Sequence, residues 1–265
     1  MWAHAAAFWP VWRWYFDRMN DGGDEPWALA ALAAAIFASW PGKGLRIVAF
    51  DRLPTTPAAL TLLYAVSAPF APPLIRALLA TSALACTWTS IAGARERIPA
   101  ILVLLVLSLP VLASLQFYAG YPLRVITAAG ATQALDAVGW PVMRAGTSMS
   151  MDGRMVLVDA PCSGVRMWWT ACVLCCLLAA QRSRLTMAGL GFSLLLALPV
   201  VLFVNTVRAT ALFVLETGVV ESPSWAHGVI GAASFSLAAL LLLASEALQN
   251  RGRGNVPAPR SMAPA

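Results

Sequence analysis

The chain has 265 residues, of which 60% are hydrophobic and only 11% are charged. This composition leaves too little polar surface for a soluble globule, and it indicates a protein that crosses a membrane several times. The net charge is +6, but the arginines stand in short clusters between apolar runs, which is typical of topology signals, so nucleic acid is excluded as a partner.

The N-terminal residues are rich in aromatic side chains, among them Trp9, Trp12 and Phe16. They lack the charged start and the cleavage site of a secretory signal, and an amphipathic segment in the headgroup region of a bilayer fits them better. We expect an interfacial segment at residues 1–26, a transmembrane domain at residues 27–250 and a disordered cytoplasmic tail at residues 251–265.

Apolar runs follow that approach the roughly 17 to 25 residues needed for one crossing. They are residues 27–41, 53–94, 98–118, 162–180, 185–204 and 229–248. Residues 53–94 are too long for one helix, and Pro69, Pro72 and Pro73 favour a turn between two spans. Residues 98–118 are expected to cross without a break. The expected fold is an all-α polytopic membrane protein, a bundle of about seven or eight transmembrane helices.

Every second loop between these runs is basic. The basic residues are Lys43, Arg46, Arg52, Arg95, Arg97, Arg182, Arg184, Arg251, Arg253 and Arg260. Such loops are expected to be cytoplasmic, which puts the N-terminus outside and the C-terminus inside. We therefore expect a multi-pass membrane protein with residues 121–161 on its extracytoplasmic face.

Two segments do not have the pattern of ordinary crossings. Within the long connection, residues 126–138 predict a short surface helix, and Asp152-Gly153 predicts a small hairpin that delivers Cys162 to the membrane face. Residues 208–220 are too short to cross at about 1.5 Å per residue. If they did cross, His227 would lie on the cytoplasmic side.

Cys162 is the strongest candidate nucleophile in the sequence. Most buried thiols are inert packing residues. Here, however, Pro161 ends an extended segment and a helix begins after Ser163 and Gly164, so the sulfur is expected near the positive end of a helix. The small neighbours leave room for a substrate carbonyl and backbone N–H groups, and Arg166 adds positive charge.

Two more polar residues lie near span ends. Arg208 is either functional or extends to the lipid headgroups, because a buried guanidinium is costly in a bilayer; both interpretations stay open. A lone histidine at headgroup level, such as His227, is more often an interface residue. The other histidine, His4, lies in the N-terminal segment, so if a histidine acts as a base it is His227.

The remaining cysteines do not predict a metal site. Cys172, Cys175 and Cys176 share a helical face, but the histidines or second cysteine pair of a zinc site are missing, so we interpret them as packing residues and expect no metal or cofactor. Acidic residues outside the spans could orient arginines or substrate; they are Asp152, Asp159, Glu216 and Glu221.

Three short motifs resemble those of one family. The run from Cys162 to Arg166 resembles the Cys-Ser-Gly signature of the exosortase and archaeosortase family, Asn205-Thr206-Val207-Arg208 its Asn-x-x-Arg motif, and the run from His227 to Gly231 its His-x-x-x-Gly motif. Their order and spacing agree as well. The resemblance covers roughly residues 116–248.

The resemblance implies a cysteine transpeptidase of a bacterial inner membrane, with Cys162, Arg208 and His227 as its essential residues. Its substrates would be secreted proteins with a C-terminal sorting tail: a motif that is often Pro-Glu-Pro (PEP-CTERM), a transmembrane helix and a basic cluster. The acceptor is unknown. We assign Ser163, Gly164, Arg166 and Asn205 to substrate binding. The alternatives are a small permease or scaffold that binds an anion through Arg208, and an intramembrane cysteine hydrolase.

Overall fold

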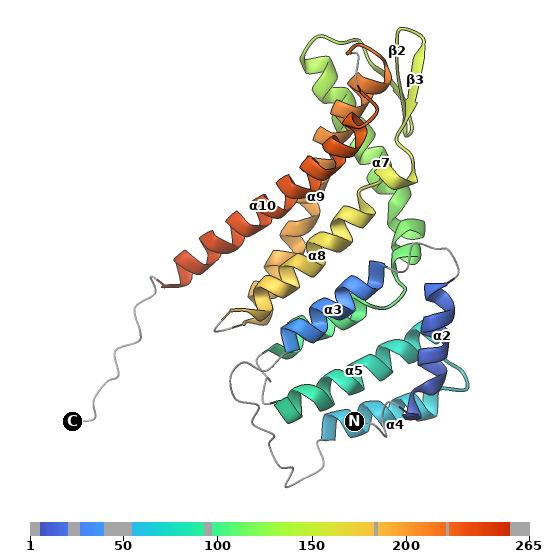
Figure 1. The fold of residues 1–265 in the computed structure, drawn as a ribbon, viewed down its shortest axis with the longest axis vertical. Coiled ribbons are helices and arrows are strands. Elements are labelled where there is room, and N and C mark those ends of the chain that lie inside the picture. Colours follow the sequence, from blue (N-terminus) through green and yellow to red (C-terminus); the bar gives the residue numbers. More distant parts are fainter. Residues whose placement is uncertain are drawn as a thin grey trace, which may run out of the picture.

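The computed structural model describes residues 6–20, 27–39, 55–92, 97–182, 185–220 and 223–254. Its helices are α2 Trp9–Met19, α3 Ala28–Ser39, α4 Thr55–Ser67, α5 Pro73–Ala92, α6 Ile98–Leu107, α7 Leu112–Ala137, α8 Val165–Ala180, α9 Met187–Glu216 and α10 Ala226–Gly254. A small sheet of β1 Met143–Ala145, β2 Ser148–Met151 and β3 Arg154–Leu157 lies at one end (Figure 1). Much of the expected tail, from residue 255 on, and the basic residues Lys43, Arg46, Arg52, Arg95 and Arg184 fall outside the described residues.

In the described part of the chain, three helices are long and apolar enough to cross a membrane: Ala160–Ala180, Met187–Glu216 and Ala226–Gln249. A fourth is added if α6 and α7 form one bent span. Helix α3 has 12 residues, which gives about 18 Å against a hydrocarbon core of about 30 Å. The all-α polytopic architecture is therefore confirmed, whereas seven or eight crossings are not.

The unbroken crossing expected at residues 98–118 is wrong. Helix α6 ends at Leu107 and α7 begins at Leu112, with an angle of 84° between them. Pro110 lies in the break, where its missing N–H and fixed φ prevent a continuous helix. After the bend α7 runs in a new direction along the end of the bundle that carries the sheet (Figure 1).

The separate surface helix expected at residues 126–138 is also wrong. These residues form the second half of α7, and Ala128, Ala131 and Leu135 are buried in a cluster with the sheet and Phe213 of α9. Similarly, residues 208–216 continue α9, which has 30 residues and places His227 beside its C-terminal end. The possibility that 208–220 crosses separately is thereby removed.

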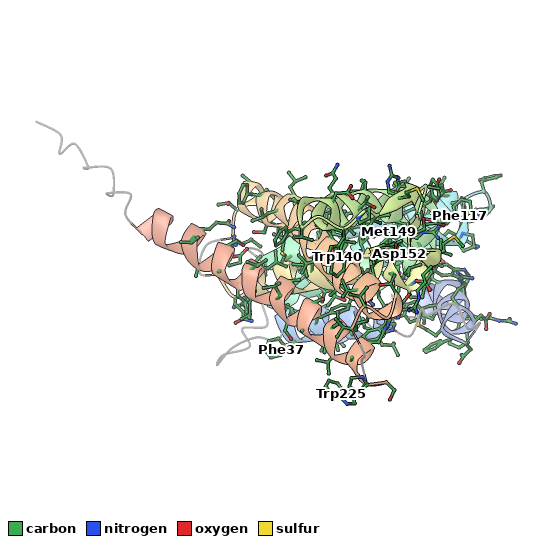
Figure 2. All side chains as sticks on the ribbon, turned by 90° about the horizontal axis from the view of Figure 1, so that it is seen from above. Phe37, Phe117, Trp140, Met149, Asp152 and Trp225 are labelled. Atoms are coloured by element: carbon green, nitrogen blue, oxygen red, sulfur yellow. The ribbon has the colours of Figure 1, made fainter. Side chains whose placement is uncertain are left out.

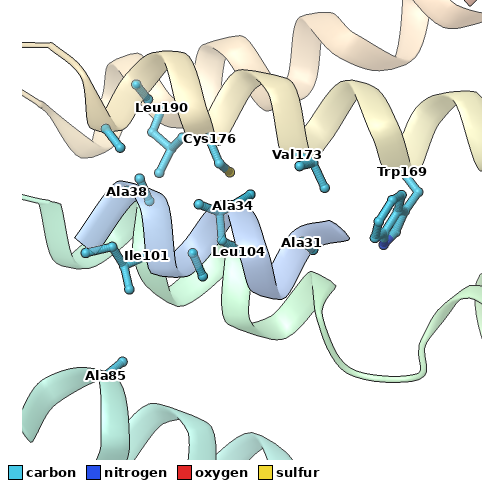
Figure 3. Packing of buried hydrophobic residues seen from close by; sticks show 14 of the residues in the cluster. Ala31, Ala34, Ala38, Ala85, Ile101, Leu104, Trp169, Val173, Cys176 and Leu190 are labelled. Carbon is cyan, nitrogen blue, oxygen red and sulfur yellow. The ribbon is translucent and has the colours of Figure 1, made fainter. Parts of the chain in front are cut away.

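The centre of the bundle is packed around the alanine-rich helix α3. Figure 3 shows Ala31, Ala34 and Ala38 of α3 between α8 and α6. Alanine side chains permit this close approach of helices. The indole N–H of Trp169 donates to the carbonyl of Leu107 at 3.1 Å, so α8 begins where α6 ends. Neighbouring helices α6 and α8 consequently run in opposite directions.

Helix α2 crosses the other helices at a large angle (Figure 1). Its Val11 and Tyr15 pack in a cluster with Ala77 and Ala80 of α5, while Trp9 on its other side is exposed. This amphipathic arrangement agrees with a helix lying along a bilayer surface, although its place in a membrane stays a prediction.

Candidate active site

The hairpin predicted before Cys162 is present. Strands β2 and β3 are antiparallel and pair Met151 with Arg154, and Asp152 and Gly153 form the turn with φ values of 51° and 76°. Positive φ at both positions is the geometry of a tight two-residue hairpin. The guanidinium of Arg154 donates to the carbonyl of Thr217 at the end of α9. The sheet is thus fixed to the helix that carries Arg208. Figure 2 looks onto this end of the molecule, with Trp140, Met149 and Asp152 labelled.

A single turn of 3-10 helix, Ala160–Cys162, follows the sheet. The carboxylate of Asp159 caps this turn by accepting the backbone N–H of Cys162 at 3.3 Å. Gly164 has a φ of 82°, and α8 begins at the next residue. Cys162 therefore lies just before a helix start, as the sequence predicts. We call residues 159–164 the cysteine turn.

Two amide side chains hold the cysteine turn from neighbouring helices. Gln116 of α7 accepts a hydrogen bond from the Ser163 hydroxyl at 3.0 Å and donates one to the carbonyl of Ala160 at 3.2 Å. Asn205 of α9 donates to the carbonyl of Cys162 at 2.9 Å and to the Thr127 hydroxyl at 3.1 Å. Three of these bonds end on the turn and fix its position, and the fourth holds Asn205 against α7.

The residues assigned to substrate binding differ in exposure. Ser163 and Asn205 are buried, at 2% and 1% of their surface, and their bonds are internal to the protein. A Cβ added to Gly164 would lie 3.1 Å from the amide nitrogen of Asn205, so this glycine permits the close contact. Arg166 is half-buried and lines open space on both sides of the turn.

Three charged groups surround the half-buried thiol of Cys162. The carboxylate of Asp159 accepts the backbone N–H of the same residue, and Arg208 and Glu216 lie close enough for their charges to act on the thiol. Glu216 in turn lies 3.9 Å from Nδ1 of His227. The structure therefore brings Cys162, Arg208 and His227 to one end of the bundle, which we call the cysteine end.

Two cavities flank the cysteine turn. The larger, of about 610 Å³, lies on the α7 side next to Ser163. The smaller, of about 220 Å³, lies on the side of Gly164 and Arg208. Pro161 and Arg166 line both, whereas the Cys162 side chain packs toward the sheet cluster. The Nε atom of Arg208 is buried and has no hydrogen-bond partner in the described part of the chain.

No group of three or more histidine, cysteine or acidic side chains in the described ranges could hold a metal ion. Cys175 and Cys176 are buried in apolar clusters. Sequence reasoning did not identify Gln116 or Thr127 as supports of the turn. Gln116 could have been noticed as a single amide side chain in an apolar run. Thr127 had no such sequence signal, because its hydrogen-bond partner Asn205 is 78 residues away.

These features define a multi-pass helical membrane protein with a fixed cysteine turn at one end. The model of the transmembrane exosortase family matches residues 2–244. The chain therefore belongs to the transmembrane exosortases, a family of membrane transpeptidases. No curated protein and no solved structure gives a significant match.

Proposed function

We propose that this exosortase uses Cys162 to cleave the C-terminal sorting tail of secreted proteins and to transfer them to an acceptor. The main support is the cysteine turn itself: Gln116 and Asn205 fix its backbone, and Arg208 lines the cavity on the Gly164 side of the turn. The cysteine end would face away from the bacterial cytoplasm, because the basic residue Arg182 follows the other end of α8.

In the first step, the thiol proton of Cys162 passes to His227 and the sulfur attacks the peptide carbonyl carbon. Arg208 donates hydrogen bonds to the resulting oxyanion. When the C–N bond breaks, the imidazolium returns the proton to the leaving amine and a thioacyl enzyme remains. The acceptor then attacks the thioester, gives its proton to His227 and releases Cys162, which regains a proton from the imidazolium.

The membrane supplies much of the positioning in this reaction. A substrate anchored by its own helix diffuses in the plane of the bilayer, so its motif meets the sulfur at a fixed height. Such a mechanism requires a rigid nucleophile more than a deep cleft. The three side-chain bonds to the turn, and the bond from Asn205 to Thr127, agree with this requirement.

The test is to incubate the full chain, in lipid vesicles, with a substrate that carries a Pro-Glu-Pro motif, an apolar helix and a basic cluster. We expect Cys162→Ala to abolish processing. The control variant Cys172→Ala, which removes a thiol within α8, should leave processing nearly unchanged. Full processing by Cys162→Ala would rule out the nucleophile. A product with a free carboxyl terminus would indicate hydrolysis. Anion transport that needs Arg208 but not Cys162 would instead support a permease.

A further inference from the structure

The larger cavity beside the cysteine turn is positively charged. Arg124 of α7 and Arg166 of α8 both line it, and no acidic residue is among the described residues that do so. The rest of its wall is mostly apolar or aromatic, formed by Leu112, Ala113, Phe117, Tyr121, Ala160 and Pro161. A ligand with an anionic group and an apolar remainder fits such a wall.

Arg124 is held in place without being neutralised. Its Nε–H donates to the carbonyl of Gly120 at 3.3 Å, and its guanidinium lies 5.7 Å from the centre of the Tyr121 ring. No carboxylate in the described part of the chain pairs with it. A half-buried guanidinium with these contacts keeps further N–H donors for a ligand, and a carboxylate is the partner that matches its planar geometry.

Arg166 connects this cavity with the reactive end. It lies in the first turn of α8 and also lines the smaller cavity, together with Arg208. Arginine side chains therefore line both sides of the cysteine turn, from Arg124 to Arg208. A substrate lying along the turn would meet these arginines in sequence.

The occupant that fits best is an extended peptide. Pro161 and Ser163, the chain neighbours of Cys162, line the larger cavity, and an extended chain advances about 3.3–3.6 Å per residue. Residues close to the attacked carbonyl would thus reach the cavity. Phe117 and Tyr121 are 79% and 58% exposed and offer rings for apolar neighbours. Figure 2 shows Phe117 at the outer edge of the molecule.

We propose that this cavity binds an acidic side chain of the peptide substrate, between Arg124 and Arg166, close to the bond that Cys162 attacks. This assignment rests on the proposed function, because it requires a peptide at the cysteine turn. It gives Arg124 a direct role in substrate selection.

The test measures binding separately from cleavage. The full chain with Cys162→Ala, in lipid nanodiscs, is titrated into a fluorescent peptide with the Pro-Glu-Pro motif, apolar helix and basic cluster, and into the same peptide with glutamine replacing glutamate. We expect the glutamate peptide to bind at least about 10-fold more tightly, as a charge-assisted bond predicts. Arg124→Gln should remove this difference, Arg124→Lys should keep part of it, and Arg144→Gln, which changes an exposed arginine of β1, should leave it intact.

Equal binding of both peptides to the protein with native Arg124 would overturn the subsite, and this comparison does not depend on the folding of any Arg124 variant. Glutamate-dependent binding without any cleavage by the wild-type enzyme would overturn the transpeptidase function and leave the subsite standing. If Arg124→Gln instead weakens binding to phosphatidylglycerol vesicles and the two peptides bind alike, the cavity binds lipid headgroups and the proposal is wrong.

Discussion

Two arginines lie at opposite ends of the bundle, and their surroundings differ. At the end of α8, Arg182 pairs with Glu246 of α10, and both side chains are almost fully buried, at 5% and 6% exposure. Ser193 of α9 donates to the same carboxylate at 2.5 Å. Arg208, at the cysteine end, has a buried Nε without a partner in the described residues and lines a cavity.

We interpret the first charge as structural and propose that the second is functional. A buried ion pair with extra hydrogen bonds joins three helices, and removal of one partner leaves an uncompensated charge. Arg208 instead lines a cavity that a ligand can enter. We call the end with Arg182 and Glu246 the locked end. The following predictions test whether the locked end and the cysteine end really divide stability and activity in this way.

The largest effect is expected at the locked end. Glu246→Ala should lower the free energy of unfolding by about 3–5 kcal/mol, because the buried Arg182 loses its carboxylate partner. Denaturant titration in detergent micelles measures this change. The double variant Arg182→Met with Glu246→Leu should recover most of the loss, since it removes both charges. A stability unchanged by Glu246→Ala would show that the pair is not structural.

At the cysteine end, activity should change instead. Arg208→Gln should reduce the rate of tail cleavage by about 100- to 1000-fold, the range for loss of one oxyanion donor, with little change in unfolding. Arg208→Lys keeps the charge but loses the planar fork, so an intermediate rate is expected. The comparison fails if Arg208→Gln destabilises the protein as strongly as Glu246→Ala.

A pair of glycines tests the rigidity of the cysteine turn. Gly164 and Gly153 both have positive φ, but a Cβ at Gly164 meets Asn205 whereas a Cβ at Gly153 meets nothing within 4 Å. Alanine at either site should cost about 1–2 kcal/mol of stability from backbone strain. Only Gly164→Ala should also slow cleavage, because it displaces Asn205 from the turn. Equal cleavage rates for the two variants would show that the contact between Gly164 and Asn205 does not affect catalysis.

The smallest effect is expected at Glu216. It lies 3.9 Å from His227, and the two side chains are 46% and 57% exposed. Exposed pairs contribute about 0.2–1 kcal/mol, so Glu216→Gln should slow cleavage by no more than about 5-fold. The matching change Glu246→Gln at the locked end should act on stability instead. A loss of 100-fold or more for Glu216→Gln would make Glu216 as important as Arg208.

The local parts of this structure could be predicted from neighbouring residues. Asp152-Gly153 predicted the hairpin, and residues 161–164 predicted the helix start after Cys162. Both features depend on the backbone angles of a few adjacent residues. The continuous crossing expected at residues 98–118 was wrong because the residues on both sides of the bend at Pro110 are apolar, and hydropathy alone does not show a bend. Asn205 and Arg208 were placed beyond a span, although they belong to the interior of α9.

The sequence by itself determined that the protein is helical and membrane-embedded, that it resembles the exosortases, and which cysteine, arginine and histidine are candidates for catalysis. These properties follow from composition and from contiguous motifs. Only the tertiary structure decided that Gln116 and Asn205 hold the cysteine turn, that Arg182 is paired with a buried carboxylate while Arg208 lines a cavity, and that Arg124 lines a cavity next to the cysteine turn. Hydrogen bonds and cavities depend on residues brought together from distant parts of the chain, and a local sequence pattern does not show which distant residues meet.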